Sequence, residues 1–271
     1  MQREIGICLW TLGISDMDEQ CRLAKELGVD GVEIVGDVTK SPSLVKAVLE
    51  KHHLSVLSVT PENKDISSEV EDVRQDAVTY FKTLLSWAHE VGAPRICLHG
   101  EVGKVAGSGN EALDWSLLVQ STKEIMTEAS KYDMPVVFEL LNRYENHQMT
   151  TVAEGLALIE EVGSPLLSLL LDAYHMNIEE SNPVQSIQQA GLHLGVYHLA
   201  DSNREGMGRG HSQLIEQLSM LDRIGYTGPI VMEMTADGPN PFTPIKQGDY
   251  VERVLFFYRE TLEKMAVRMT E

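Results

Sequence analysis

The strongest constraint on the fold is a repeated unit, one short apolar run followed by one amphipathic helical stretch, which occurs eight times along the 271 residues. The units follow one another at roughly 30-residue spacing, as in βαβ proteins. Most runs are apolar throughout, which is typical of parallel strands buried on both faces. We predict strands at Ile5–Trp10, Gly31–Val35, Ser55–Thr60, Arg95–His99, Val136–Leu141, Ser168–Asp172, Val196–Ala200 and Pro229–Met234. Eight such units close into an α/β barrel, a (β/α)8 TIM barrel, predicted as one domain over residues 1–271.

Helix boundary signals support this division of the chain. Asp16 or Ser15, Ser41-Pro42, Thr150 or Thr151 and Asn182-Pro183 are typical helix starts, and glycines such as Gly28 and Gly163 are typical ends. The predicted helices are Asp18–Leu27, Ser43–His52, Val70–Val91, Glu111–Tyr132, Val152–Val162, Pro183–Ala190, Ser212–Ile224 and Gly248–Val267. A doubly wound open sheet is the alternative, but it usually carries a glycine-rich phosphate loop after its first strand. Here that strand leads into Trp10-Thr11-Leu12-Gly13, so the barrel is favoured.

Composition excludes several classes of partner and compartment. Lys and Arg total 22 and Asp and Glu 41, a net charge of −19, which disfavours nucleic acid and anionic membrane surfaces. Apolar runs fall short of the roughly 20 residues needed to cross a bilayer, and the start has no signal-peptide pattern. Three cysteines without CxxC spacing (Cys8, Cys21 and Cys97) indicate buried thiols in a reduced cytoplasm.

Four consecutive strands end on residues that can bind a metal. Glu139, Asp172, His198 and Glu233 are each the first strongly polar residue after an apolar run. Strands that are adjacent in sequence are adjacent around a barrel, and functional sites lie at their carboxyl ends, so we expect the four side chains to converge. Three carboxylates and one imidazole suit Mn²⁺ or Mg²⁺, with Co²⁺, Fe²⁺ or Zn²⁺ as alternatives. For any one of these residues, a hydrogen-bonded or salt-bridged polar group is the simpler interpretation; four in succession favour a metal site.

Three segments resemble a known family. Glu139-Leu-Leu-Asn-Arg-Tyr-Glu145, Asp172-Ala-Tyr-His175 and His198-Leu-Ala-Asp-Ser-Asn-Arg204 are similar to the D-tagatose 3-epimerase and D-psicose 3-epimerase group of the xylose-isomerase-like TIM barrels. The general resemblance extends over the whole chain, including Glu26–Glu33, although the specific motifs all lie in the second half.

The resemblance implies a metal-dependent ketose 3-epimerase that takes a free ketose through an enediolate. It implies that Glu139, Asp172, His198 and Glu233 bind the metal, typically manganese, and that Glu139 and Glu233 are also the acid/base pair. Glu145, His175 and Arg204 would bind the substrate oxygens. It also implies a homodimer or homotetramer.

Two loops depart from the family pattern, which leaves the identity of the sugar open. Glu205–His211 keeps glycines but lacks the usual proline and tryptophan, and Gly100–Lys104 lacks the aromatic residues of many members. Polar or aromatic residues at other strand ends carry weaker signals, and a Pro-rich loop, Asp237–Pro244, is a candidate cover for the site. These weaker candidates are Trp10, Glu33, Glu62, His99 and Glu101.

Three other functions remain as alternatives. The same metal site suits aldose–ketose isomerisation or the processing of hydroxypyruvate or an inosose by an isomerase or dehydratase. An endonuclease IV-like enzyme shares the barrel, but it uses a histidine-rich zinc site and needs a basic groove. A sugar binder without turnover is the third, and the pair Glu139 and Glu233 argues against it.

Overall fold

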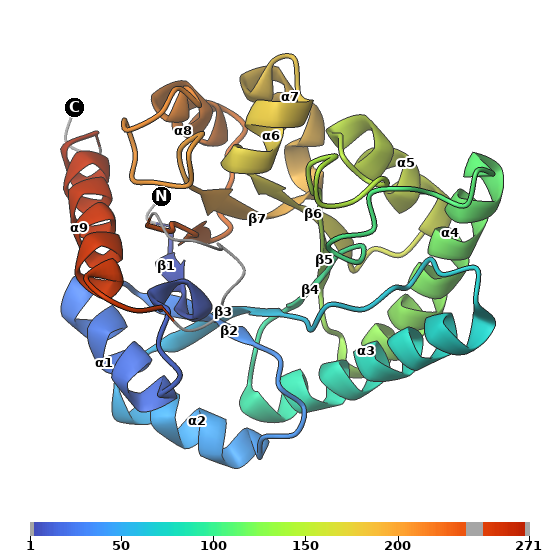
Figure 1. Cartoon of the computed structure of the whole chain (residues 1–271), viewed down its shortest axis with the longest axis horizontal. Coiled ribbons are helices and arrows are strands. Elements are labelled where there is room, and N and C mark those ends of the chain that lie inside the picture. Colours follow the sequence, from blue (N-terminus) through green and yellow to red (C-terminus); the bar gives the residue numbers. More distant parts are fainter. Residues whose placement is uncertain (1–2, 237–245, 269–271) are drawn as a thin grey trace.

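The computed structural model describes residues 3–236 and 246–268, and eight parallel strands within them form a barrel surrounded by helices (Figure 1). The strands are β1 Ile5–Cys8, β2 Gly31–Val35, β3 Ser55–Thr60, β4 Ile96–Leu98, β5 Val136–Glu139, β6 Leu167–Asp172, β7 Leu194–Leu199 and β8 Ile230–Met232. Their hydrogen-bonded order is β3-β2-β1-β8-β7-β6-β5-β4, and β3 and β4 lie side by side at the remaining seam. There the Arg95 guanidinium donates to the Leu57 carbonyl oxygen at 2.6 Å. The predicted (β/α)8 TIM barrel is confirmed.

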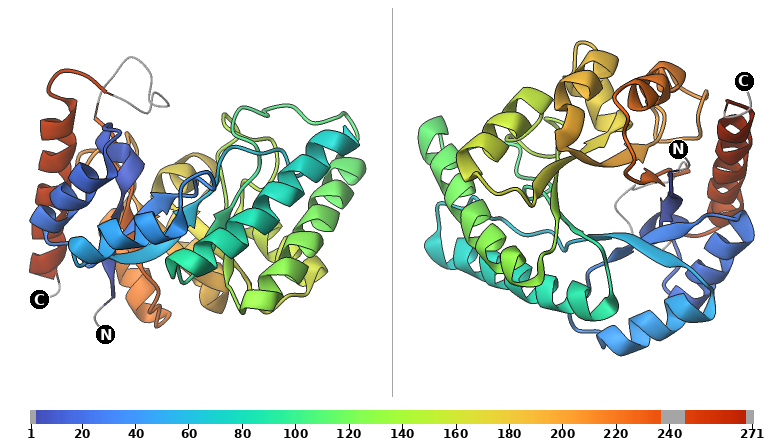
Figure 2. Two further views of the ribbon diagram at one scale, coloured as in Figure 1. Left: turned by 90° about the horizontal axis from the view of Figure 1, so that it is seen from below. Right: turned by 180° about the vertical axis from the view of Figure 1, so that it is seen from behind.

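The helices form an outer layer around the strands, as the two further views in Figure 2 show. They are α1 Met17–Leu27, α2 Pro42–Lys51, α3 Glu71–Val91, α4 Glu111–Ala129, α5 Val152–Val162, α6 Ala173–Glu179, α7 Pro183–Ala190, α8 Leu214–Arg223 and α9 Tyr250–Arg268, with 3-10 turns η1 Leu9–Leu12, η2 Ser130–Tyr132 and η3 Gly191–His193. Within the described part of the chain, no helix combines the length and apolarity needed to span a membrane.

Three of the predicted helix starts carry side-chain caps; at the fourth, Ser41 makes no side-chain cap hydrogen bond and α2 begins with Pro42. The Asp16 carboxylate accepts from the first backbone amides of α1, and the Asn182 side chain accepts from the Gln185 amide of α7. Thr151 and Glu154 form a reciprocal capping box at the start of α5. Each cap satisfies amide groups that have no partner within the helix, which fixes where the helix begins.

Several predicted boundaries are wrong by a few residues; β5, for example, ends at Glu139 and not at Leu141. The first strand ends at Cys8 rather than Trp10, because the next residues form η1, where the Thr11 hydroxyl donates to the Cys8 carbonyl oxygen at 2.6 Å. The short helix α6, directly after β6, was not predicted. It begins there because the Asp172 carboxylate accepts from the Tyr174 amide at 2.8 Å and caps it. The predicted covering loop Asp237–Pro244 lies outside the described residues.

The barrel interior holds a small apolar layer that is separate from the core between strands and helices. It consists of one buried residue from each of seven strands, namely Cys8, Leu57, Cys97, Val137, Leu170, Val196 and Val231. Strand β2 contributes no apolar residue to this layer, and the residue of β2 that pairs with Cys8 is Glu33. All three cysteines are buried and free, as predicted. We call this seven-residue layer the apolar floor of the barrel. The buried carboxylate of Glu33 lies beside it.

Candidate metal centre

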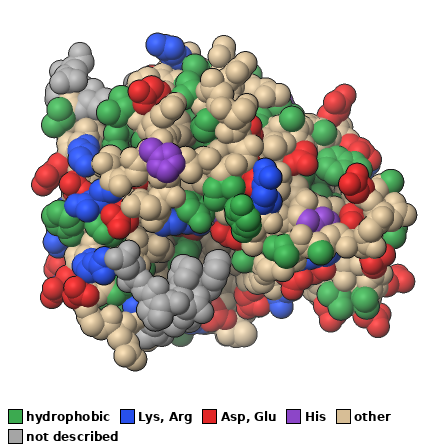
Figure 3. Space-filling model, turned by 45° about the horizontal axis from the view of Figure 1, so that its top comes forward, with side chains coloured by type: hydrophobic (Ala, Val, Ile, Leu, Met, Phe, Trp, Pro, Cys, Tyr) green, Lys and Arg blue, Asp and Glu red, His purple; other side chains and the backbone are tan. Residues whose placement is uncertain are grey.

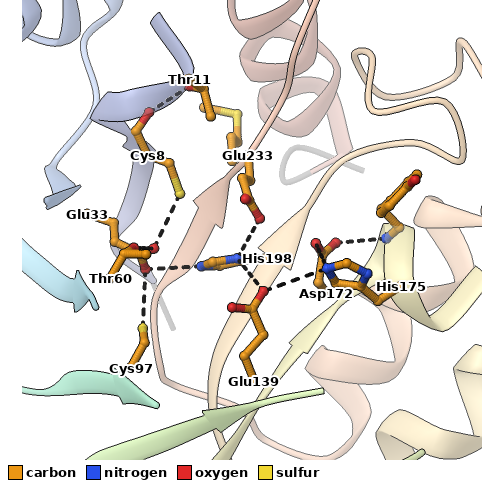
Figure 4. Close-up of polar contacts among 12 residues, drawn as sticks. Cys8, Thr11, Glu33, Thr60, Cys97, Glu139, Asp172, His175, His198 and Glu233 are labelled. Carbon is orange, nitrogen blue, oxygen red and sulfur yellow. Dashed lines mark hydrogen bonds and ion pairs between the residues drawn. The ribbon is translucent and has the colours of Figure 1, made fainter. Parts of the chain in front are cut away.

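The four predicted strand-end residues lie together at the carboxyl ends of β5 to β8 (Figure 4). Glu139 and Asp172 are the last residues of β5 and β6, His198 stands one residue before the end of β7, and Glu233 directly follows β8. Each offers one ligand atom, and these atoms lie within 4.8 Å of one another. All four residues are buried. Parallel strands in register bring them together: Asp172 and His198 are direct partners between β6 and β7.

The His198 imidazole is held between carboxylates on both sides. Its Nδ1 lies 2.9 Å from Glu233 Oε2 and 3.7 Å from Glu139 Oε1, and its Nε2 lies 3.0 Å from Glu33 Oε2. Burial alone would lower the pKa of His198, but the carboxylates of Glu33 and Glu233 outweigh burial and raise that pKa well above its usual value.

The carboxyl groups differ sharply in how readily they ionise. Burial raises the pKa of Glu139 well above its ordinary value, and the neighbouring Glu233 and Asp172 add to the shift against the opposing effect of His198. Burial, together with Glu233, also raises the pKa of Asp172 to about 7, although Arg204 opposes the shift. Arg204 and His198 lower the pKa of Glu233 despite its burial. The metal-free cluster therefore lacks the positive charge that would keep all three of its carboxyl groups ionised.

A divalent cation fits this set of donors. The three carboxylates and the imidazole are buried, their donor atoms are grouped, and their mutual repulsion is what a cation would relieve. Oxygen donors with one imidazole suit a hard or intermediate ion, and the group contains no thiolate. The residues present therefore fit the metal that the sequence predicts.

The predicted substrate residues border the same centre. Arg204 Nη1 lies 2.9 Å from both Asp172 Oδ2 and Glu233 Oε2. His175 Nε2 is 3.6 Å from Asp172 Oδ2, and Glu145 Oε1 is 4.0 Å from His175 Nδ1. Arg204 and His175 are thus next to candidate ligands, and Glu145 lies next to His175.

Three residues that were not predicted hold these side chains in place. The Asn142 side-chain amide lies 2.8 Å from His175 Nδ1 and donates to Glu145 Oε1 at 3.0 Å. The Tyr174 ring lies under the Arg204 guanidinium, 4.3 Å from ring centroid to Cζ, a cation–π contact. Asn142 and Tyr174 stand inside the segments that carry the family resemblance, so their position in those segments was the available signal.

The third unpredicted residue is Asp201, which organises the loop after β7. Its carboxylate accepts from the amides of Ser202, Gly208 and Ser212 at 2.8 to 3.0 Å. Within this loop Arg204 adopts a left-handed backbone conformation, with φ of 62°. That conformation is costly for a residue with a side chain, so the surrounding hydrogen bonds must maintain it.

The weaker candidates divide into buried and peripheral residues. His99 is buried, and its Nδ1 is 2.6 Å from the Gly100 carbonyl oxygen. Trp10 packs against the apolar floor, the structural role considered for it. Glu62 pairs with Lys64 at 3.2 Å, and Glu101 is partly exposed. Glu33 contacts His198 directly.

The chain matches the family model of the xylose isomerase-like TIM barrel over residues 21–257. It is 32% identical over 178 residues to a D-psicose 3-epimerase of Agrobacterium fabrum, covering 63% of this chain and 60% of that protein. It is 37% identical over 176 residues to a D-psicose 3-epimerase of Ruminiclostridium cellulolyticum, covering 63% and 59%. The match therefore spans less than two thirds of the length of these relatives. A 3-dehydro-D-guloside 4-epimerase of Escherichia coli is 28% identical over 224 residues, covering 79% of this chain and 86% of that protein.

Solved structures agree with the observed fold. A D-psicose 3-epimerase from Clostridium cellulolyticum H10, crystallised with D-tagatose, has a TM-score of 0.86 at 24% identity, covering 97% of this chain and 98% of that one. A family 2 AP endonuclease from Brucella melitensis has a TM-score of 0.77 at 17% identity, covering 89% and 96%. At these identities the likeness concerns the barrel alone, and the choice between sugar and nucleic-acid chemistry lies with the site. Since the family model matches most of its length, this chain belongs to the xylose isomerase-like TIM barrel family.

Proposed function

We propose that the protein is a divalent-metal-dependent ketose 3-epimerase that acts on a free ketohexose or a related ketose. The observation that carries the proposal is the buried cluster of Glu139, Asp172, His198 and Glu233, with Arg204 beside it. The names of the sequence relatives, D-psicose 3-epimerases among them, support the same reaction.

The four clustered residues would hold the metal. Mn²⁺ is the proposed ion, with Mg²⁺, Co²⁺, Fe²⁺ and Zn²⁺ as alternatives. When bound, a divalent ion supplies Lewis acidity that stabilises negative charge developing on the sugar oxygens, and so makes the C–H beside the carbonyl more acidic.

Glu139 and Glu233 are the proposed acid and base. They come from β5 and from the end of β8, and in Figure 4 they approach His198 from different sides. One carboxylate removes the proton from C3, and the electron pair of the broken C3–H bond moves into the enediolate. The other carboxyl group returns a proton to C3 on the opposite face. Two groups are needed because a single carboxylate cannot reach both faces of a fixed sugar.

Arg204, His175 and Glu145 would orient the substrate oxygens. The Arg204 guanidinium keeps its charge at all working pH values and offers several fixed donors. Burial, with Arg204 nearby, lowers the pKa of His175 well below its usual value. This imidazole is therefore neutral, with one ring nitrogen that can donate a hydrogen bond and one that can accept. The site then combines a permanent cation with a neutral hydrogen-bonding ring.

A second candidate is epimerisation or isomerisation at another carbon of a keto sugar. The Escherichia coli relative is named as a 4-epimerase. The match to this chain covers 86% of that relative, compared with 60% of the D-psicose 3-epimerase of Agrobacterium fabrum. The carbon that exchanges hydrogen distinguishes the two candidates. Hydrolysis of nucleic acid is disfavoured by the net charge of −19.

The test is incubation of Mn²⁺-loaded protein with a panel of free ketoses in D₂O, followed by NMR to locate the deuterated carbon. We expect label at C3 and a new 3-epimer, and we expect Glu139→Gln and Glu233→Gln each to abolish both. Asp114→Asn is the matched control, because Asp114 is a buried acid in α4 away from the cluster, and it should retain exchange. Exchange at another carbon alone would replace the 3-epimerase with the second candidate, and full activity in either Gln variant would remove that residue from the acid/base pair.

We further propose that this single-domain enzyme is a cytoplasmic homodimer or homotetramer with no nucleic-acid or membrane partner. The family resemblance supports the assembly, and three free buried thiols suit a reducing compartment. Light scattering after size exclusion measures the assembly; a monomer at micromolar concentration would contradict it.

A further inference from the structure

Glu33 is a carboxylate placed where the barrel interior is otherwise apolar. It belongs to β2, it is 1% exposed, and it pairs in register with Cys8 beside the apolar floor. A buried carboxylate is costly unless hydrogen bonds or charges compensate it, so its partners indicate its role.

Five donors surround the Glu33 carboxylate (Figure 4). One of them is the Cys97 thiol of β4, which donates to Oε2 at 3.8 Å. The Ser58 and Thr60 hydroxyls, both from β3, donate to its two oxygens, one to each. The Cys8 thiol donates to Oε1 at 3.5 Å, and His198 Nε2 lies 3.0 Å from Oε2. Both oxygens are thus fixed by protein groups, and the carboxylate cannot rotate without losing them.

This arrangement determines which nitrogen of His198 faces the candidate ligands. A neutral imidazole has one N–H and one lone pair, and a carboxylate only accepts hydrogen bonds. In the metal-free protein both ring nitrogens of His198 face carboxylates, Nε2 facing Glu33 and Nδ1 facing Glu233 at 2.9 Å and Glu139 at 3.7 Å. A cation in the cluster would take the place of the Nδ1 proton, and the remaining N–H, on Nε2, would stay directed at Glu33. That is the tautomer a metal ligand needs.

We propose that Glu33 is a positioning residue that holds His198 in the Nε2–H tautomer and fixes the plane of its ring, so that Nδ1 is available to a divalent ion. The proposal rests on the proposed metal dependence and deepens it. Glu33 touches neither the substrate nor the ion; it acts through His198, as carboxylates behind ligating histidines do.

A competing assignment places an ion on Cys8, Glu33 and His198, whose ligand atoms also form a close group. Two features oppose it. Both oxygens of Glu33 already accept hydrogen bonds from β3, and Cys8 is fully buried in the apolar floor, which disfavours a thiolate.

The first test measures the dissociation constant of Mn²⁺ by calorimetric titration, without turnover. Glu33→Gln should weaken Mn²⁺ binding about 10- to 100-fold, the usual effect of losing such a partner. The double variant Ser58→Ala/Thr60→Val, which leaves Glu33 but removes two of its anchors, should show a smaller loss. Asp114→Asn should bind as the wild type does. Wild-type affinity, within about twofold, in a folded Glu33→Gln protein would overturn the proposal.

The second test reads the tautomer in wild-type protein, and it decides the matter if Glu33→Gln does not fold. In protein labelled with ¹⁵N-histidine and loaded with diamagnetic Zn²⁺, long-range ¹H–¹⁵N correlation should place the His198 proton on Nε2. A proton on Nδ1 would overturn the proposal. So would a thiolate-to-metal charge-transfer band in Co²⁺-loaded protein, which would place the ion on Cys8.

These outcomes remain separate from the proposed reaction. Mn²⁺ binding that depends on Glu33, without exchange of any sugar hydrogen, would refute the epimerase and leave the positioning role. Epimerisation by the wild type, with unchanged Mn²⁺ affinity in Glu33→Gln, would refute the positioning role and leave the epimerase. A wild-type protein that binds neither Mn²⁺ nor Zn²⁺ would refute both.

Discussion

Glu139, Asp172 and His198 each gain affinity for protons when the metal-free chain folds. Burial and nearby carboxylates raise the pKa of Glu139 well above its usual value and that of Asp172 to about 7. Despite burial, Glu33 and Glu233 raise the pKa of His198. Between about pH 4.5 and 8 these three groups therefore bind more protons in the folded protein than in the unfolded chain, so they make the free energy of unfolding fall as pH rises. The buried imidazoles of His99 and His175, whose pKa values are lowered, act in the opposite direction as pH rises toward about 6.5. Glu33 and Glu233, whose pKa values are also lowered, do so at lower pH.

Metal-free protein should consequently have a lower melting temperature at pH 8 than at pH 5.5, at equal ionic strength. Mn²⁺ should raise the melting temperature most at pH 8, because there it does not have to displace protons. Glu139→Gln should flatten the pH dependence of the metal-free protein by removing one of the ionising groups. Differential scanning calorimetry after EDTA treatment measures all three effects, and a melting temperature of the wild type that rises from pH 5.5 to 8 would contradict this account of the charges.

Arg204 and a metal ion compete for the same oxygens. Its Nη1 lies 2.9 Å from Asp172 Oδ2 and from Glu233 Oε2. Arg204→Ala should lower kcat/KM about 10- to 100-fold, the effect of losing one charge-assisted hydrogen bond to the substrate, while Mn²⁺ binds at least as tightly as in the wild type. Arg143→Ala, which removes an exposed arginine paired with Glu179, is the control and should change neither value. Loss of Mn²⁺ binding in Arg204→Ala would show that Arg204 supports the metal centre and not the substrate.

At the scale of elements, the loop after β7 positions Arg204. The Arg204 amide donates to the Asp201 carbonyl oxygen at 2.8 Å, and the Arg204 carbonyl oxygen accepts from Thr235 after β8, also at 2.8 Å. The Asp201 carboxylate closes the rest of the loop through three amides. The left-handed conformation of Arg204 thus depends on contacts with two strand ends.

Asp201→Ala should leave those amides without their acceptor and destabilise the protein by about 1–3 kcal/mol. It should also lower turnover, since Arg204 loses its fixed position, while Mn²⁺ affinity changes little. Urea unfolding and the exchange assay measure the two effects. Asp37→Ala, which removes a carboxylate that accepts from Thr39 in an exposed turn, is the control and should leave turnover unchanged. Unchanged turnover in Asp201→Ala would contradict the positioning of Arg204 by this loop.

The sequence predicts elements best where one local signal decides them. The helix start at Thr150 or Thr151 and the buried run before Glu139 are such cases. Helix α5 begins after Thr151, and β5 carries the Glu139 carboxylate, although it ends two residues before the predicted Leu141. Helix α6 was missed because Asp172 has two roles that sequence alone does not separate, strand end and helix cap. The partners of Glu33 come from β1, β3, β4 and β7, so its role depends on barrel closure and not on any local pattern.

At the scale of the whole molecule, the barrel places the proposed cation site inside a strongly acidic protein. Acidic side chains are spread over the face seen in Figure 3, and the net charge is −19. Such a surface attracts divalent cations and repels phosphate backbones. It agrees with the proposed small neutral sugar as substrate and disfavours a nucleic acid.

The most direct test of the central claim is anomalous X-ray diffraction at the manganese absorption edge from crystals soaked in MnCl₂. The account predicts one strong peak that contacts Glu139, Asp172 and Glu233 through oxygen and His198 through Nδ1. No peak among these four side chains, or a peak held by Cys8 instead, would contradict it.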